Sequence, residues 1–391
     1  MRGDRSPAPP DNAASEQGRP TGPVVAAPAT RDAPAQPAVV ARSRPRRSGW
    51  PGVAALGVTV VVALVAAVAF GPAHIALADV ARALARRLWR GPAVAGAASW
   101  QQTVVWSIRL PRALLGFVVG GALALSGAAL QGLFRNPLAD PSILGVASGA
   151  SLGAVLTIFV GLAARAVWLL PAGAFAGAAL TAFIVLGVAA QRGRGRMFTT
   201  TMLLVGVAVG ALNVAFTTFV LSVSLTSYDV GRQIIHWIMG GLDGRTWDHL
   251  LLAAPAIVIG GAAILVHARE LDALLLGEVT AQSIGVDVPR VRVVLVLATS
   301  LLIGAAVAAA GPIGFVGLLV PHILRLAVGS MHRTLLPACF LGGGLFVVLA
   351  DLTARTLLVP MEIPVGVVTA AVGAPFFLGL LVRRGQEISD G

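Results

Sequence analysis

The sequence predicts an all-α membrane protein whose chain crosses the bilayer about ten times. Hydrophobic residues make up 57% of the 391 positions and charged residues only 12%, more apolar surface than a soluble chain of this length can bury. The apolar residues fall into long stretches separated by short polar, Gly or Pro breaks. One stretch, from Ala113 to Phe134, carries no charge. As a helix it would measure roughly 33 Å, enough to cross a hydrocarbon core of roughly 30 Å.

The chain is expected to contain three parts. Residues 1–48 are rich in Pro, Ala, Arg and Ser, lack apolar periodicity, and predict a disordered cytoplasmic tail. A transmembrane domain at 49–384 and a short cytoplasmic tail at 385–391 follow. The expected spans cover residues 50–70, 113–134, 142–162, 167–190, 198–223, 250–266, 293–310, 313–328, 335–352 and 364–382.

The orientation follows from the arginines before the first span. Arg42, Arg44, Arg46 and Arg47 place the N-terminus in the cytoplasm by the positive-inside rule. An even number of spans brings the C-terminus to the same side. Residues 72–108 and 224–248 then form external connections. The first is expected to contain an amphipathic interfacial helix, while hydropathy leaves open whether the second contains a short helix that dips into the interface.

The polar segment 267–292 is the most informative for mechanism. Leucines recur at helical spacing beside carboxylates, and Gly277 and Gly285 divide the segment into two short helices. A solvated linker would leave Leu271, Leu274 and Leu275 in water, so docking of a cytoplasmic partner is favoured.

Three arginines are expected at the outer face. Arg109, Arg112 and Arg355 could each be a simple interfacial anchor, or together they could form an electropositive collar for an acidic soluble partner. Asp351 precedes Arg355 by four residues, the spacing of a helical ion pair. Structural pairing is favoured for this carboxylate, and a proton relay is the alternative.

Two features of the spans concern their architecture. The Pro-x-x-x-Pro turns at Pro137–Pro141 and Pro360–Pro364 each contain one carboxylate and would lie on opposite sides of the membrane, which suggests an inverted repeat unless the similarity is coincidental. Pro321 lies within a span and frees a backbone carbonyl that the His322 ring or a neighbouring helix must satisfy.

The composition also excludes some functions. All 29 basic residues are Arg, so the chain lacks the lysine that a P-loop ATPase requires. Six scattered histidines and one cysteine, Cys339, show no metal-site spacing, and no cofactor is expected. The net charge of +12 is read as membrane orientation rather than nucleic-acid binding.

Several motifs resemble the permease subunits of bacterial ABC importers for iron-siderophores, haem and cobalamin, the FecCD or BtuC-like permeases. They are IRLPR at 108–112, QGLFRNPLADPSILGVASGA at 131–150, LGEVTAQSIGV at 276–286, GPIGFVGLLVPHILR at 311–325, and LADLTAR followed by PMEIPVGVVTAAVGAPFF within 349–377. The resemblance covers almost all of 50–384.

The resemblance implies a non-enzymatic permease with a BtuC-like inverted-repeat bundle in the bacterial inner membrane, paired with a second permease subunit as a homodimer or, alternatively, a heterodimer. Two ATP-binding subunits would dock on a cytoplasmic loop around Leu275, Gly277, Glu278, Ala281 and Gly285. An extracytoplasmic substrate-binding protein would dock on Arg109, Arg112 and Arg355. The hydroxyl cluster Thr199, Thr200 and Thr201 resembles the family's inner constriction.

The substrate is expected to be an iron chelate, most simply an iron(III)-siderophore, with haem or cobalamin as alternatives. A proton-coupled secondary transporter that uses Asp351 as its relay is the alternative from a different class.

Overall fold

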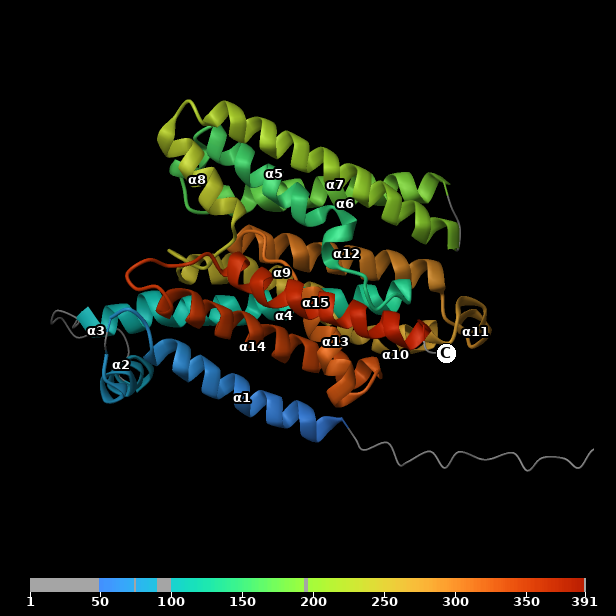
Figure 1. The fold of residues 1–391 in the computed structure, drawn as a ribbon, viewed down its shortest axis with the longest axis horizontal. Coiled ribbons are helices and arrows are strands. Elements are labelled where there is room, and N and C mark those ends of the chain that lie inside the picture. Colours follow the sequence, from blue (N-terminus) through green and yellow to red (C-terminus); the bar gives the residue numbers. More distant parts are fainter. Residues whose placement is uncertain (1–48, 74, 90–99, 193–195, 390–391) are drawn as a thin grey trace, which may run out of the picture. The chain divides into compact units, whose positions relative to one another are not determined.

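The computed structural model describes residues 49–73, 75–89, 100–192 and 196–389 (Figure 1). The predicted disordered tail, residues 1–48, lies outside these residues. Helices and connecting turns account for all of the described chain, and no strand occurs among the described residues. The predicted all-α class is therefore confirmed.

Seven helical segments are long and apolar enough to cross a bilayer, and three shorter apolar helices accompany them. The long ones are α1 (Trp50–Ala69), the continuous α3, η1 and α4 (Trp100–Thr103, Val104–Arg109 and Leu110–Phe134), α6 (Leu169–Arg192), α7 (Arg196–Ser224), α9 (Trp247–Val266), α12 (Val288–Ala310) and α14 (His332–Thr356). The shorter ones are α5 (Val146–Phe159), α13 (Val316–Val328) and α15 (Val365–Ser389), whose apolar part ends at Gly379. Each corresponds to one of the ten expected spans.

Helix α4 is the central helix of the bundle. Only five of its 25 residues are not buried, and it contacts α14, α12, α13 and α9 (Figure 1). Helix α1 packs on α14, whereas α5, α6 and α7 pack on one another and are joined to the rest mainly through α12. The outer helices α6 and α7 expose many large apolar side chains, as expected for helices that contact lipid.

The connecting segments contain short helices. Helix α2 (Leu77–Trp89) follows α1, α8 (Tyr228–Ile238) precedes α9, and α10 (Ala268–Leu275) and α11 (Glu278–Ser283) lie between α9 and α12. The helices α2 and α8 lie at one end of the bundle and α10 and α11 at the other (Figure 1). We call the first the arginine end, because Arg109, Arg112 and Arg355 lie there, and the second the α11 end.

A glycine contact holds α4 against α14. A Cβ atom added to Gly120 would lie 2.2 Å from the carbonyl oxygen of Gly343, and one added to Gly343 would lie 2.2 Å from that of Gly120. Beside this contact the rings of Phe117 and Phe340 meet edge to face, with centroids 5.5 Å apart. Small residues let membrane helices approach closely, so these glycines set the distance between the two helices.

The carbonyl that Pro321 frees in α13 is satisfied by a neighbouring helix. Proline has no N–H to bond the carbonyl of Gly317, four residues earlier. The side-chain amide of Gln131 on α4 donates to that oxygen at 3.3 Å, and Arg325 donates to the amide oxygen of Gln131 at 3.0 Å. The sequence left open whether the His322 ring or a neighbouring helix would bond this carbonyl. The neighbouring helix α4 does so, through Gln131.

Several helices extend beyond the uncharged windows. Helix α12 begins at Val288, capped by the Asp287 carboxylate, which accepts from the Arg290 N–H at 3.2 Å. Helix α14 continues to Thr356 and so includes Asp351 and Arg355, and α15 continues to Ser389, into the segment expected to be a tail. The expected spans stopped at charged residues and were therefore shorter than the helices, because long charged side chains can reach polar partners from within a helix.

Substituting Gly120 tests the contact between α4 and α14. We expect Gly120→Ala to lower the free energy of unfolding by about 1–3 kcal/mol, because the new methyl group overlaps the Gly343 carbonyl. The control is Gly187→Ala on α6, where an added Cβ meets nothing within 4 Å. It should leave stability unchanged or raise it by up to about 1 kcal/mol. Unfolding of the purified protein in detergent measures both, and equal effects would contradict the close contact.

Candidate functional site

Arg112 lies at the centre of an ion-pair cluster at the arginine end. Its Nε and Nη2 donate to Asp351 Oδ1 at 2.9 and 2.8 Å, and its Nη1 lies 2.8 Å from Glu362 Oε2. Asp243, in the connection between α8 and α9, lies 3.9 Å from the same Nη1. Arg112 is 7% exposed and Asp351 2%, so the central pair is enclosed, while Glu362 and Asp243 are exposed.

Arg109 and Arg355 bond the C-terminal end of α1. Arg109 Nη1 donates to the carbonyls of Val68 and Ala69 at 3.2 and 2.8 Å, and its Nη2 donates to that of Ala73. Arg355 donates to the carbonyl of Ala67. The last carbonyls of a helix have no partner within it and carry partial negative charge, so two guanidiniums are matched to this end in both hydrogen bonding and charge.

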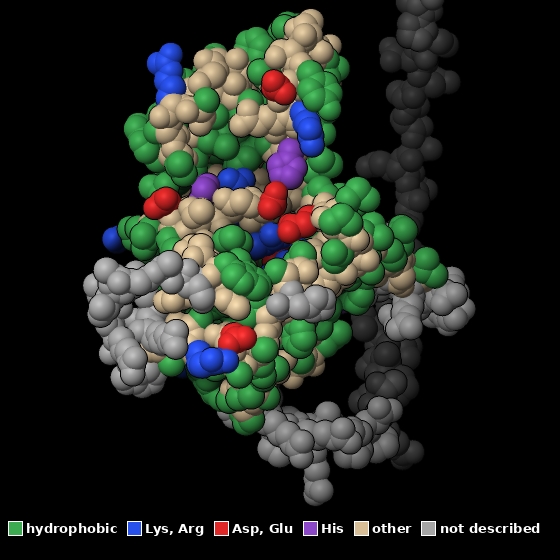
Figure 2. All heavy atoms as spheres, turned by 90° about the vertical axis from the view of Figure 1, so that its left-hand side faces the viewer, with side chains coloured by type: hydrophobic (Ala, Val, Ile, Leu, Met, Phe, Trp, Pro, Cys, Tyr) green, Lys and Arg blue, Asp and Glu red, His purple; other side chains and the backbone are tan. Residues whose placement is uncertain are grey.

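The structure therefore brings together the three arginines that the sequence placed at one face, but it buries all of them. Figure 2, which views this end, shows acidic and basic side chains gathered near the middle of the face, between apolar groups. Each guanidinium has partners within the chain. An exposed collar is not what the geometry gives, and docking of a partner on these arginines stays a prediction.

Asp351 and Arg355 do lie together, with Arg355 Nε 3.5 Å from Asp351 Oδ2. The shorter contacts of Asp351 are to Arg112, which is 239 positions away in the chain. Spacing within a helix predicted the Asp351–Arg355 pair but contains no information about the Arg112–Asp351 pair. The helix ends of α1 were likewise not identified as the partners of Arg109 and Arg355.

The segment between α9 and α12 forms two short helices, as predicted. Gly277 and Gly285 have φ of 110° and 90°, a region that favours glycine, and they end α10 and α11 respectively. The expectation for the leucines is wrong in part. Leu271 and Leu274 are buried in the protein's own core, and only Leu275 is exposed, at 44%. Ala281 is also buried, on the inner side of α11.

The exposed apolar surface of this segment consists of residues that sequence reasoning missed. Leu276, Val279 and Ile284 join Leu275 there, and Val279 is 82% exposed. Helix α11 has only six residues, too few for periodicity to assign its outer face. A patch of this kind on a loop outside the membrane-spanning helices is typical of a surface that contacts another protein.

Glu278 connects α11 to the bundle. Its Oε1 forms an ion pair with Arg292 near the start of α12 and lies 3.8 Å from Arg135, the residue that ends α4. A second link runs from Asp272 on α10, whose Oδ1 lies 2.8 Å from both the backbone N and the Nδ1 of His332 at the start of α14. Movement of these two short helices would therefore act directly on α4, α12 and α14.

The three threonines of the predicted inner gate lie in the first two turns of α7. Thr200 is exposed and Thr201 half-buried, while the side chain of Thr199 lies outside the described residues. The proposed constriction stays a prediction.

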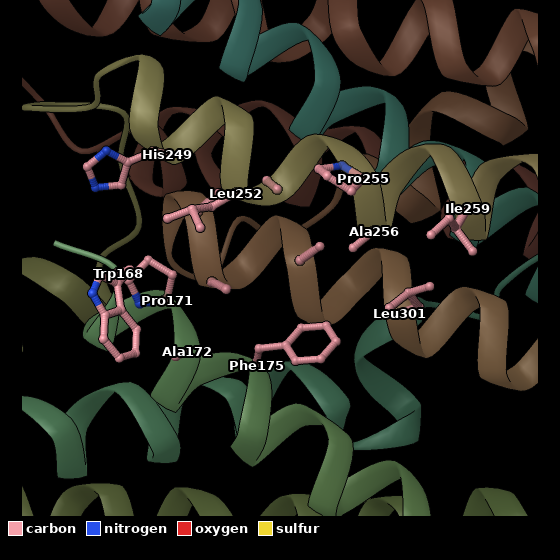
Figure 3. Close-up of a pocket in the computed structure, with 14 residues that line it drawn as sticks. Trp168, Pro171, Ala172, Phe175, His249, Leu252, Pro255, Ala256, Ile259 and Leu301 are labelled. Carbon is pink, nitrogen blue, oxygen red and sulfur yellow. The ribbon is translucent and has the colours of Figure 1, made fainter.

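The structure also contains an apolar cavity of about 410 Å³ between α6, α9 and α12 (Figure 3). Trp168, Pro171 and His249 lie at one end, and Phe175, Ile259 and Leu301 lie further along (Figure 3). It brings together no set of polar groups. In the described part of the chain no three His, Cys, Asp or Glu side chains are placed to hold a metal ion.

Ten apolar helices, ion pairs enclosed at one end, and an exposed apolar patch at the other describe a multi-span membrane protein. Residues 59–383 match the FecCD transport family. The chain belongs to this family, whose members are permease subunits of ABC importers, and no catalytic role is indicated for it.

Named relatives extend the comparison. The cobalamin import system permease protein BtuC of Halobacterium salinarum is 44% identical over 364 residues, 85% of this chain and 95% of that protein. The vitamin B12 import system permease protein BtuC of Yersinia enterocolitica is 46% identical over 282 residues, 71% of this chain and 82% of that protein. A solved structure described as an inward-facing metal-chelate type ABC transporter has a TM-score of 0.73 and 30% identity, covering 85% of this chain and 99% of that one.

The Arg112–Asp351 pair provides a test of this cluster. Arg112→Gln leaves an enclosed carboxylate with only its weaker contact to Arg355, so we expect the free energy of unfolding to fall by about 3 kcal/mol. In the double variant with Asp351→Asn the two losses should not add, with a coupling of about 1–3 kcal/mol. The exposed Arg165→Gln is the control and should change stability by less than about 0.5 kcal/mol. Additive losses at Arg112 and Asp351 would contradict the pairing.

Proposed function

We propose that this chain, paired with a second copy, imports a cobalamin-type metal chelate, driven by two separate ATP-binding subunits. The observation that carries the proposal is the 44% identity to a cobalamin permease over 95% of that protein's length. An iron(III)-siderophore, the substrate expected from the sequence, is the second candidate, because the solved relative is described only as a metal-chelate transporter. The relatives named for cobalamin favour cobalamin over the siderophore. Haem is the third candidate and is included in the uptake assay described below.

The proposed contact with the ATP-binding subunits is the exposed patch on α10 and α11, which we place on the cytoplasmic side. Leu275, Leu276, Val279 and Ile284 supply apolar area that would otherwise face water. Gly277 and Gly285 provide the turns that present α11, while Glu278 and the buried Ala281 hold it against the bundle. This orientation puts both chain ends in the cytoplasm and the arginine end outside.

The proposed contact with a substrate-binding protein is the arginine end. Arg109 and Arg355 are committed to carbonyls of α1, so Arg112 is the arginine best able to meet an acidic partner. Its contact with Asp351 is enclosed, but its contact with Glu362 lies at the rim. An incoming carboxylate would take the place of Glu362 on Arg112 Nη1.

Proton coupling through Asp351 is a weaker candidate. The carboxylate is 2% exposed and is engaged by two guanidiniums of the chain itself, which leaves it little contact with a water path.

Uptake into proteoliposomes tests the transport proposal. The permease is reconstituted with its ATP-binding subunits and binding protein, and uptake of cobalamin, a ferric siderophore and haem is compared with and without ATP. We expect ATP-dependent uptake of cobalamin. Val279→Asp should abolish it together with co-purification of the ATP-binding subunits, whereas Gln282→Asp, which adds the same charge at an exposed polar position of α11, should reduce it much less. Uptake driven by a proton gradient without ATP would contradict the proposal.

Glu362→Gln tests the proposed docking on Arg112. Removal of the rim carboxylate frees Arg112 Nη1, so the binding protein should bind about fivefold more tightly at low salt, and the gain should shrink as salt is added. The control is Asp229→Asn, which removes one negative charge from an exposed position on α8. Surface-plasmon measurements on the reconstituted permease report both. Equal or absent gains would mean that Arg112 has only a structural role.

A further inference from the structure

A second cavity, of about 540 Å³, lies at the α11 end between the start of α1, the end of α9, the start of α10 and the start of α14. Its lining combines apolar and basic groups: Trp50, Leu265, Val266, Ala268, Arg269, His332 and Arg333. It is separate from the exposed patch of α11, and none of the roles proposed above uses it.

Among the described residues, the two arginines of this cavity form no ion pair. Arg269 and Arg333 are both exposed, and within the described residues neither has a carboxylate within ion-pair distance. Glu270 follows Arg269 directly but forms no ion pair with either arginine, and Asp272 is already bound to His332. Two guanidiniums therefore line one cavity without a counter-ion from the described chain, and together they can bind a phosphate group from two sides.

The rest of the lining indicates that the anion belongs to a lipid. Leu265 and Val266 end the membrane-spanning helix α9 and point outward, with Val266 73% exposed. Trp50 begins α1 and is also exposed, and tryptophan is enriched where a span meets the headgroup layer. The cavity is thus continuous with the hydrocarbon-facing surface on one side and basic on the other, which is the amphipathic pattern of a phospholipid.

We propose that this cavity binds an anionic bilayer phospholipid, with its phosphate between Arg269 and Arg333 and an acyl chain along the end of α9. Basic pockets between spans at the membrane surface are a recognised way to hold such headgroups. Because Arg269 belongs to α10 and Arg333 to α14, the lipid would join the same two helices that Asp272 and His332 join. The bilayer would then help to fix the helix that leads into α11.

Native mass spectrometry of the full-length permease in detergent tests the proposal, with phosphatidylglycerol and phosphatidylcholine as the probes. The variant is Arg269→Gln with Arg333→Gln, and the matched control is Arg165→Gln with Arg290→Gln, which removes two exposed arginines outside the cavity. We expect the variant to lose about thirtyfold in affinity for phosphatidylglycerol, with phosphatidylcholine binding unchanged and the control close to the parent.

Three results would overturn the proposal. They are an equal loss in the control, equal binding of the two lipids by the parent, and displacement of phosphatidylglycerol by millimolar inorganic phosphate, which would identify a site for a free anion. If the double variant is poorly folded, Val266→Glu provides a second test, because it places a carboxylate in the cavity lining, on the surface proposed to contact the acyl chain. This variant should also lose phosphatidylglycerol, and retention of parental affinity would reject the site.

Discussion

The close approach of α4 and α14 at Gly120 and Gly343 is the constraint on which the rest of the structure depends. In a bilayer the hydrophobic effect does not drive helices together, so close packing of small residues must do so. The contact is antiparallel, and it sets the register of both helices. Eight residues from it on each helix lie Arg112 and Asp351, which form the central ion pair. In the other direction, Gly132 lies against His332.

One helix pair therefore positions both ends of the molecule. At the arginine end it encloses the pair that Glu362 and Asp243 approach from two different connections. At the α11 end it brings His332 to Asp272 of α10, while Arg135 at the end of α4 approaches Glu278 of α11. Helix α4 is buried along most of its length and contacts polar side chains of other elements at Arg112, Gln131 and Arg135.

The sequence predicted the features that depend on local pattern. The ten spans, the breaks at Gly277 and Gly285 and the proximity of Asp351 to Arg355 follow from hydropathy, glycine conformation and helical spacing. The partner of Arg112 lies 239 positions away and has no local signature. The buried face of α10 was also not predictable, because Leu271 and Leu274 have the same spacing and composition whether they face the core or a partner. Only the packing of α10 on α4 and α14 decides that question.

At the arginine end, the contacts made by the arginines require a guanidinium rather than a lysine ammonium. Arg109 reaches three carbonyls of the α1 terminus and its following turn, and Arg112 reaches two carboxylates with separate edges of one guanidinium. A planar group with five donors can make such divided contacts, whereas a lysine ammonium is a single point charge. The division also separates two tasks. The edge of Arg112 that bonds Asp351 is enclosed and joins α4 to α14, while the edge that bonds Glu362 has an exposed partner, which is the one that the proposed docking would replace.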